Sequence, residues 1–191
     1  MSPVQIILML LLCAAAVTTD LRSRKIPNKI TVPFALAGMI WQTYQFGWTG
    51  AKSSLFGFFV GFLIFLIPYA LKGMGAGDVK MMAALGALSN WQFILYTALL
   101  TAVMGGLIVL ISRIIQGGFV TLLKNVGSML IYGPLWLISK IYPSPKISGL
   151  MARFHVELSR EASNYIPYAL AIALGTVSCL VLLWTGRISV G

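Results

Sequence analysis

The sequence GMGAGDVK at residues 73–80 lies between two strongly apolar runs and contains one of only two aspartates in the 191-residue chain. The other aspartate, Asp20, ends the first apolar run, and the two remaining acids are glutamates near residue 160. A charged side chain at membrane depth is costly, so an acid in such a position is by default a candidate functional group. Asp20 and Asp78 are therefore the first candidates for a site.

Composition indicates a membrane protein. The chain is 59% hydrophobic and only 9% charged, whereas soluble domains carry about 25% charged residues. Its net charge of +10 comes from basic residues placed between apolar runs, which favours membrane orientation and anionic lipid headgroups over nucleic acid as the explanation. We expect one membrane-embedded domain over residues 1–191, in an all-α polytopic fold with lipids as partners.

Apolar runs predict about six transmembrane helices. They lie at residues 3–19, 30–48, 54–71, 78–88, 92–112 and 164–185. The first run lacks a preceding basic residue, so we expect a retained helix and not a cleaved signal peptide. The second ends in an aromatic cluster suited to the membrane interface, at Trp41, Tyr44, Phe46 and Trp48. In the third, Gly57 and Gly61 form a small-xxx-small pair that favours close helix packing.

The cytoplasmic segment 114–162 is predicted to contain an interfacial amphipathic helix. The alternative is a seventh span over 119–138, which is long enough to cross. Charge distribution decides between them, because six spans place 12 of the 14 basic residues on the cytoplasmic side. A seventh span would export four of these, which are Lys140, Lys146, Arg153 and Arg160.

The six-span topology places both aspartates at the cytoplasmic ends of helices, at similar depth. Two carboxylates that meet can share a proton, because close like charges resist double ionisation. One can then activate water while the other polarises a carbonyl, which hydrolyses a peptide without metal or covalent intermediate. Gly73, Gly75 and Gly77 remove side chains beside Asp78, so an extended substrate could approach and pair with the backbone there. An ordinary interhelical turn is the alternative for these glycines.

Three motifs in order resemble bacterial type IV prepilin peptidases. They are Gly75-Ala76-Gly77-Asp78, which matches the GxGD motif of intramembrane aspartyl proteases, Asp20 followed by Ile26-Pro27-Asn28, and Ile166-Pro167-Tyr168. The likeness covers about residues 5–110 and 164–175. It implies cleavage of prepilin leader peptides at the cytoplasmic face of the bacterial inner membrane. Asp20 and Asp78 would be the catalytic pair, and Gly75, Gly77, Ile26, Pro27 and Asn28 would support the substrate or the backbone.

The chain also departs from part of that family. Longer members carry a cytoplasmic Cys-x-x-Cys zinc region linked to N-methylation, and this chain has only Cys13 and Cys179, each inside an apolar run. It resembles the short, cleavage-only members of tight-adherence (Flp-type) pilus systems, so methyltransferase activity is not expected. No metal or cofactor is expected either, since His155 lies in a polar segment and is best explained as solvated.

A non-enzymatic role is the competing interpretation. The two acids could bind a cation or relay protons in a transporter, or the chain could be a structural membrane subunit of a secretion system. Lys80 lies two residues after Asp78, about 200° round a helix, and is expected to contact a loop or headgroups instead of the acid.

Overall fold

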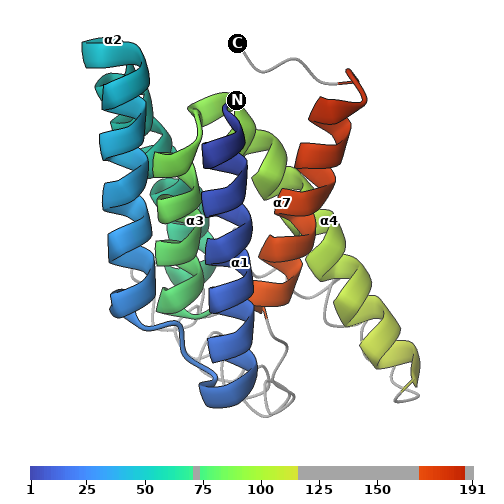
Figure 1. Ribbon diagram of the computed structural model, residues 1–191. Helices are drawn as coiled ribbons and strands as arrows, with labels where there is room; N and C mark the ends of the chain where they lie inside the picture. Colours follow the sequence, from blue (N-terminus) through green and yellow to red (C-terminus); the bar gives the residue numbers. More distant parts are fainter. Residues whose placement is uncertain (71–73, 116–167, 188–191) are drawn as a thin grey trace, which may run out of the picture. The chain divides into compact units, whose positions relative to one another are not determined.

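The computed structural model describes residues 1–70, 74–115 and 168–187, and their regular structure is entirely α-helical. The helices are α1 (Pro3–Ser23), α2 (Asn28–Ala70), α3 (Ala76–Leu88), α4 (Trp91–Ile115) and α7 (Tyr168–Trp184). They are shown in Figure 1. The all-α prediction is therefore confirmed for this part of the chain. The predicted interfacial helix within 114–162 and the alternative span at 119–138 lie outside the described residues, except for residues 114 and 115, which belong to α4.

The chain divides into two compact units, Met1–Gly106 with Pro167–Gly191, and Leu107–Ile166. Every contact discussed below belongs to the first unit. Of the second, only residues 107–115, the end of α4, are described. The single domain over residues 1–191 stays a prediction.

Helix α1 has well-defined signals at both ends. Ser2 is its N-cap, and Ser2 and Gln5 form a reciprocal capping box ahead of the apolar run. The helix ends where Arg24 adopts a left-handed conformation (φ 54°) and donates its backbone N–H to the Asp20 carbonyl at 2.8 Å. The apolar run predicted a helix over 3–19, but α1 continues to Ser23, so Asp20 lies inside its last turns.

Helix α2 comprises two arms that meet at Gly47. Its backbone there (φ 58°, ψ −137°) is a conformation that glycine adopts without the steric cost of a Cβ. The chain folds back so tightly that a Cβ on Gly50 would collide with the Gln42 carbonyl. The two-span prediction placed the turn at 49–53, which is wrong, because these residues are helical and the reversal is made at Gly47. Figure 1 shows this reversal at the same end of the bundle as the N-terminus.

Helix α3 is short and almost completely enclosed. From Asp78 to Leu88 every residue except Lys80 is buried. Both arms of α2 pack on it through glycines: a Cβ on Gly38 would come within 2.8 Å of Ala87 and Leu88 backbone atoms, and one on Gly61 within 2.5 Å of the Met82 carbonyl. Gly57 likewise packs directly on the backbone of Gly86. The predicted packing role of the Gly57 and Gly61 pair is confirmed.

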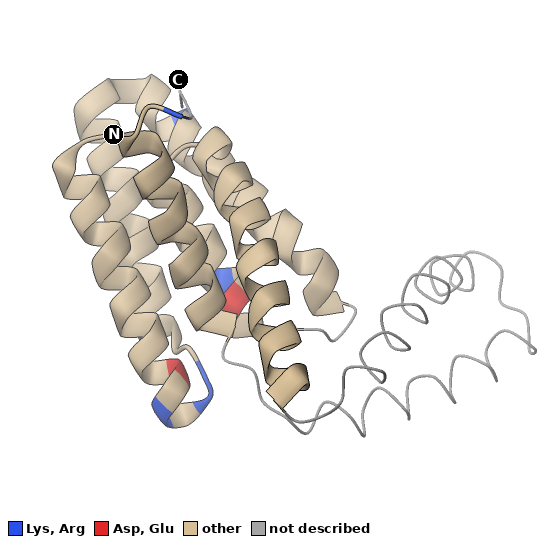
Figure 2. Ribbon diagram, turned by 90° about the vertical axis from the view of Figure 1, so that its right-hand side faces the viewer, with Lys and Arg blue, Asp and Glu red and all other residues tan. Residues whose placement is uncertain are grey.

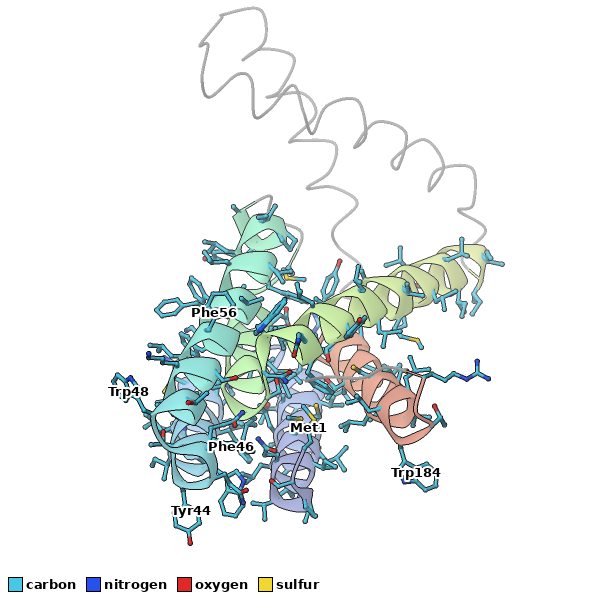
Figure 3. The ribbon with its side chains drawn as sticks, turned by 90° about the horizontal axis from the view of Figure 1, so that it is seen from above. Met1, Tyr44, Phe46, Trp48, Phe56 and Trp184 are labelled. Atoms are coloured by element: carbon cyan, nitrogen blue, oxygen red, sulfur yellow. The ribbon has the colours of Figure 1, made fainter. Side chains whose placement is uncertain are left out.

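Three of the described helices are long and apolar enough to cross a membrane. They are α1, α2 and the Trp91–Ser112 part of α4, whereas α3 has 13 residues and α7 has 17. The count of about six spans is not confirmed. Figure 3 shows Tyr44 and Trp48 projecting outward around the α2 reversal. The exposures are 81% for Tyr44, 61% for Phe46 and 75% for Trp48. Such rings suit a membrane interface at this level.

Candidate active site

Asp78 occupies the first turn of α3. Its Oδ2 accepts a hydrogen bond from the Gly75 backbone N–H at 3.1 Å, and its own N–H donates to the Gly75 carbonyl at 3.2 Å. The side chain is only 7% exposed. Burial of the side chain and the nearby Asp20 carboxyl oppose a negative charge at this position, whereas the Gly75 hydrogen bond and the partial positive charge of the helix N-terminus favour a carboxylate.

Asp20 lies in the last turns of α1 and is 5% exposed. Three basic residues that follow closely are exposed: Arg22 lies in the last turn of α1, and Arg24 and Lys25 belong to the turn into α2. Two opposite influences therefore act on this acid. The C-terminal end of a helix disfavours a negative charge, whereas nearby cations favour it, although exposed charges are screened by salt.

The two acids come from separate helices, 58 residues apart in sequence, and the fold places them in the same part of the bundle. The Asp20 carboxyl lies close enough to the Asp78 carboxyl for the two to interact electrostatically. In Figure 2 the acidic positions, coloured red, both lie in the part of the bundle opposite the N-terminus. Both acids thus lie within electrostatic range of each other, and the catalytic role of the pair stays a prediction.

The turn between α1 and α2 is fixed against the start of α3. Ile26 is 7% exposed, and a Cβ on Gly77 would lie 2.9 Å from the Ile26 Cβ. On the outer side of this contact, the Lys80 ammonium donates to the Asn28 side-chain oxygen at 2.8 Å. Lys80 thus contacts a loop-flanking residue, as the sequence predicts. These two contacts connect the segment after Asp20 to the helix that carries Asp78.

The remaining predicted support residues have other surroundings. Pro27 is exposed, and its carbonyl accepts the Ile30 N–H at 3.0 Å, which starts α2. Gly75 is exposed beside Asp78, and both its N–H and its carbonyl are hydrogen-bonded to Asp78. Gly77, by contrast, is covered by the side chain of Ile26.

Tyr168 is a further residue near the acids. It is the first residue of α7, half-buried, and close enough to Asp78 for an electrostatic interaction between the two groups. Sequence reasoning quoted Tyr168 only as part of a motif and gave it no role. The sequence signal that could have indicated a role was a tyrosine side chain at the start of an apolar run.

The described residues contain no group of three or more His, Cys, Asp or Glu side chains that could hold a metal ion. Cys13 and Cys179 are both buried and reduced. His155, Glu157 and Glu161 lie outside the part of the chain that the structure describes.

The segment that carries both acids also matches a known family. Residues 6–110 match the model of the type IV leader peptidase family, which is more than half of the chain. The chain belongs to this family. The matched region includes most of α1, all of α2 and α3, and most of α4, and hence both acids and the turn packed against Gly77.

Among the relatives of this chain, three examples bear the name prepilin leader peptidase/N-methyltransferase. The Escherichia coli K12 protein is 29% identical over 133 residues, 63% of this chain and 58% of the relative. The Pseudomonas putida protein is 30% identical over 124 residues, 60% and 40% respectively. The Burkholderia pseudomallei protein (strain 1026b) is 28% identical over 114 residues, 53% and 36% respectively. The chain thus matches between 36% and 58% of these relatives' lengths. No solved structure matches it.

Proposed function

We propose that this chain is an intramembrane aspartyl endopeptidase that removes the leader peptide from type IV prepilins, of the Flp-like kind, at the cytoplasmic face of the bacterial inner membrane. The observation that carries the proposal is the placement of two buried aspartates from separate helices, α1 and α3, within electrostatic range of each other, in the region that matches a leader peptidase family. Membership of that family supports a peptidase with prepilin substrates, and the apolar helices support a membrane location.

The mechanism assigns different protonation states to the two acids. Asp78 has the helix N-terminus and the Gly75 N–H to stabilise its anion, so it is the base. Asp20, near the C-terminal end of α1, carries the shared proton. Asp78 takes a proton from water as the oxygen attacks the scissile carbonyl carbon, while Asp20 donates its proton to the carbonyl oxygen.

The tetrahedral diol then collapses. The C–N bond breaks, the proton held by Asp78 passes to the leaving amine, and Asp20 recovers its proton from the diol hydroxyl. The products are a carboxylic acid on the leader and a new amino terminus on the pilin. The atoms and protons of this proposed hydrolysis balance without a cofactor.

Substrate binding is proposed at the exposed start of α3. Gly75 and Ala76 are both exposed beside Asp78, so an extended leader segment can approach the backbone there. Ile26 closes the opposite side by covering Gly77. In this proposal, Gly75 serves the substrate, whereas Gly77 allows Ile26, with Pro27 and Asn28, to close the turn.

The reaction is proposed to end at cleavage. The described residues offer no metal cluster, and the chain has no Cys-x-x-Cys pair of the kind that longer family members carry. N-methylation of the new terminus is therefore not part of the proposed function.

A transporter or a structural secretion subunit is the alternative, because paired membrane acids also bind cations or relay protons. Asp20→Asn and Asp78→Asn distinguish these roles in purified protein incubated with candidate prepilins, with cleavage read by mass spectrometry. Each change keeps the side-chain size, and each should abolish cleavage, while exposed Gln45→Ala on α2 should not. Cleavage that survives in both Asp variants, at unchanged thermal stability, would contradict the proposed mechanism.

A further inference from the structure

The C-terminal end of α3 has every backbone acceptor satisfied, although it lies inside the bundle. Ser89 donates its N–H and hydroxyl to the Leu85 carbonyl, at 3.1 and 2.8 Å, and its N–H also reaches the Gly86 carbonyl. The next three carbonyls accept bonds from distant side chains. Ser54 Oγ donates to Ala87 at 2.7 Å, Gln5 Nε2 to Leu88 at 3.2 Å, and Gln42 Nε2 to Ser89 at 2.6 Å.

The three donors come from three different segments. Gln5 belongs to α1, Gln42 to the first arm of α2 and Ser54 to the second arm. All are buried, with exposures of 4%, 5% and 0%. The last carbonyls of a helix have no partner within it, and lipid supplies none. These side chains therefore replace water at the end of α3.

Gln5 is held rigidly for this task. Its Oε1 accepts the Ser2 N–H at 2.8 Å and the Ser2 hydroxyl at 3.2 Å, which orients its Nε2 toward α3. Ser2 Oγ in turn accepts the Trp41 indole N–H at 2.9 Å, connecting this group to α2. The donors are thus parts of one hydrogen-bonded assembly at the end of the bundle where the N-terminus lies.

The Gln5 bond joins the two helices that carry the acids. Gln5 and Asp20 lie 15 residues apart on α1, and Leu88 and Asp78 lie 10 apart on α3. At a rise of about 1.5 Å per residue, these are stretches of about 22 and 15 Å. Because helices are stiff rods, the register at one end sets the axial offset of the acids at the other.

Part of the packing on α3 offers no side chains that would resist its sliding along α2. Its contacts with α2 run through Gly38, Gly57 and Gly61, which present bare backbone and no interlocking side chain at these points. Directional hydrogen bonds to named carbonyls fix the axial position instead, since a shift of one residue would break them.

We propose that Gln5, with Gln42 and Ser54, forms a register lock that fixes α3 against α1 and so positions Asp78 relative to Asp20. Gln5 acts through the helices and is a positioning residue, not a catalytic one. The activity part of this inference rests on the proposed function, whereas the register part does not.

The test compares Gln5→Leu and Gln42→Leu with Gln45→Leu, a matched change at an exposed position one turn from Gln42. Spin labels at exposed Ala14 on α1 and Ala76 on α3, with the buried native cysteines replaced by alanine, report the register of the full-length protein in lipid nanodiscs. We expect the label distance to shift by about 1.5 Å, one residue's rise, or its distribution to broaden, in the two lock variants only.

Prepilin cleavage by the same variants without labels gives the second measurement. Misplaced catalytic groups lower kcat, so we expect kcat to fall at least about tenfold with KM unchanged in the lock variants. If Gln5→Leu does not fold, Ser54→Ala, which removes a single hydroxyl, should give a smaller change in the same direction.

Two results would overturn the lock. One is an unchanged label distance in Gln5→Leu and Gln42→Leu. The other is a fall in kcat that matches the loss of folded protein, which indicates a structural role only. If the wild-type protein cleaves no prepilin, the proposed function fails, and the label distances still decide whether the lock exists.

Discussion

Replacing Gly77 with alanine probes the contact that connects the two acid-bearing segments. The new Cβ would lie 2.9 Å from the Ile26 Cβ, 3.2 Å from the Ile26 N and 3.3 Å from its Cγ1. Carbon atoms in contact prefer a separation of about 3.5–4.0 Å. The turn after α1 must therefore move away from α3 by about 0.6–1 Å, and the clash is with stiff atoms, because Ile26 is β-branched and precedes a proline.

Stability and activity should respond differently to this change. Overpacking costs about 1–3 kcal/mol, and alanine regains about 1 kcal/mol of helix propensity over glycine, so the net loss of stability is about 0–2 kcal/mol. A misplacement of about 1 Å can cost about 10²-fold in rate, because the reacting groups must be aligned. We expect kcat for prepilin cleavage to fall between about tenfold and 100-fold while most of the protein stays folded.

Mass spectrometry of cleavage time courses, with thermal unfolding of each variant, measures both effects. Gly106→Ala is the control, because a Cβ there meets nothing within 4 Å. Gly75→Ala is the intermediate case, since its Cβ would lie 3.3 Å from Asp78 Oδ2, the end of a side chain that can adjust. Wild-type kcat in Gly77→Ala would show that the Ile26 contact does not hold the acids in place.

Three further predictions concern chemistry and topology. Chelators and serine- or cysteine-directed reagents should leave cleavage intact, and a loss restored by one specific metal would exclude the two-acid mechanism. A cysteine at Arg24 should react with impermeant reagents only from the cytoplasm and one at Thr49 only from outside; the reverse labelling would invert the proposed orientation. In infrared difference spectra at neutral pH, a protonated-carboxyl band should vanish in Asp20→Asn and survive in Asp78→Asn, and the opposite pattern would exchange the roles of the acids.

Several features of the site followed from local sequence. The two aspartates stand out because an apolar chain has so few acids, and the glycines before Asp78 indicate a backbone that other groups approach closely. Spacing also predicted that Gly57 and Gly61 face a neighbouring helix, as they do against α3. The packing inference succeeds because it depends on residues within about one helical turn, while the role of the acids stays a prediction.

Other features depend on tertiary contacts and were missed. Residues 49–53 contain Gly50 and Ser53, which favoured a turn there, but the chain reverses at Gly47, within the aromatic cluster. Gln5 and Gln42 read as isolated polar residues in apolar runs, and nothing local indicates that their partners are the carbonyls of Leu88 and Ser89. A donor and an acceptor 83 residues apart can be paired only once the helices are packed.

The length of α3 explains why these distant bonds matter to the acids. Its 13 residues extend about 20 Å, whereas the hydrocarbon core of a bilayer is about 30 Å thick. The α2 reversal, with exposed Tyr44 and Trp48, follows closely on Gln42, whose amide caps the end of α3. With that reversal at one interface, the N-terminal end of α3 lies about 10 Å short of the other interface. Asp78, in the first turn of α3, therefore lies below the membrane surface. Helix α1, at 21 residues, is long enough to cross the core, and in the proposed orientation Asp20 would lie about one turn inside the cytoplasmic interface. We therefore expect the leader to enter the bundle as an extended segment before cleavage, because a helical substrate would not present its backbone to Gly75 at that depth.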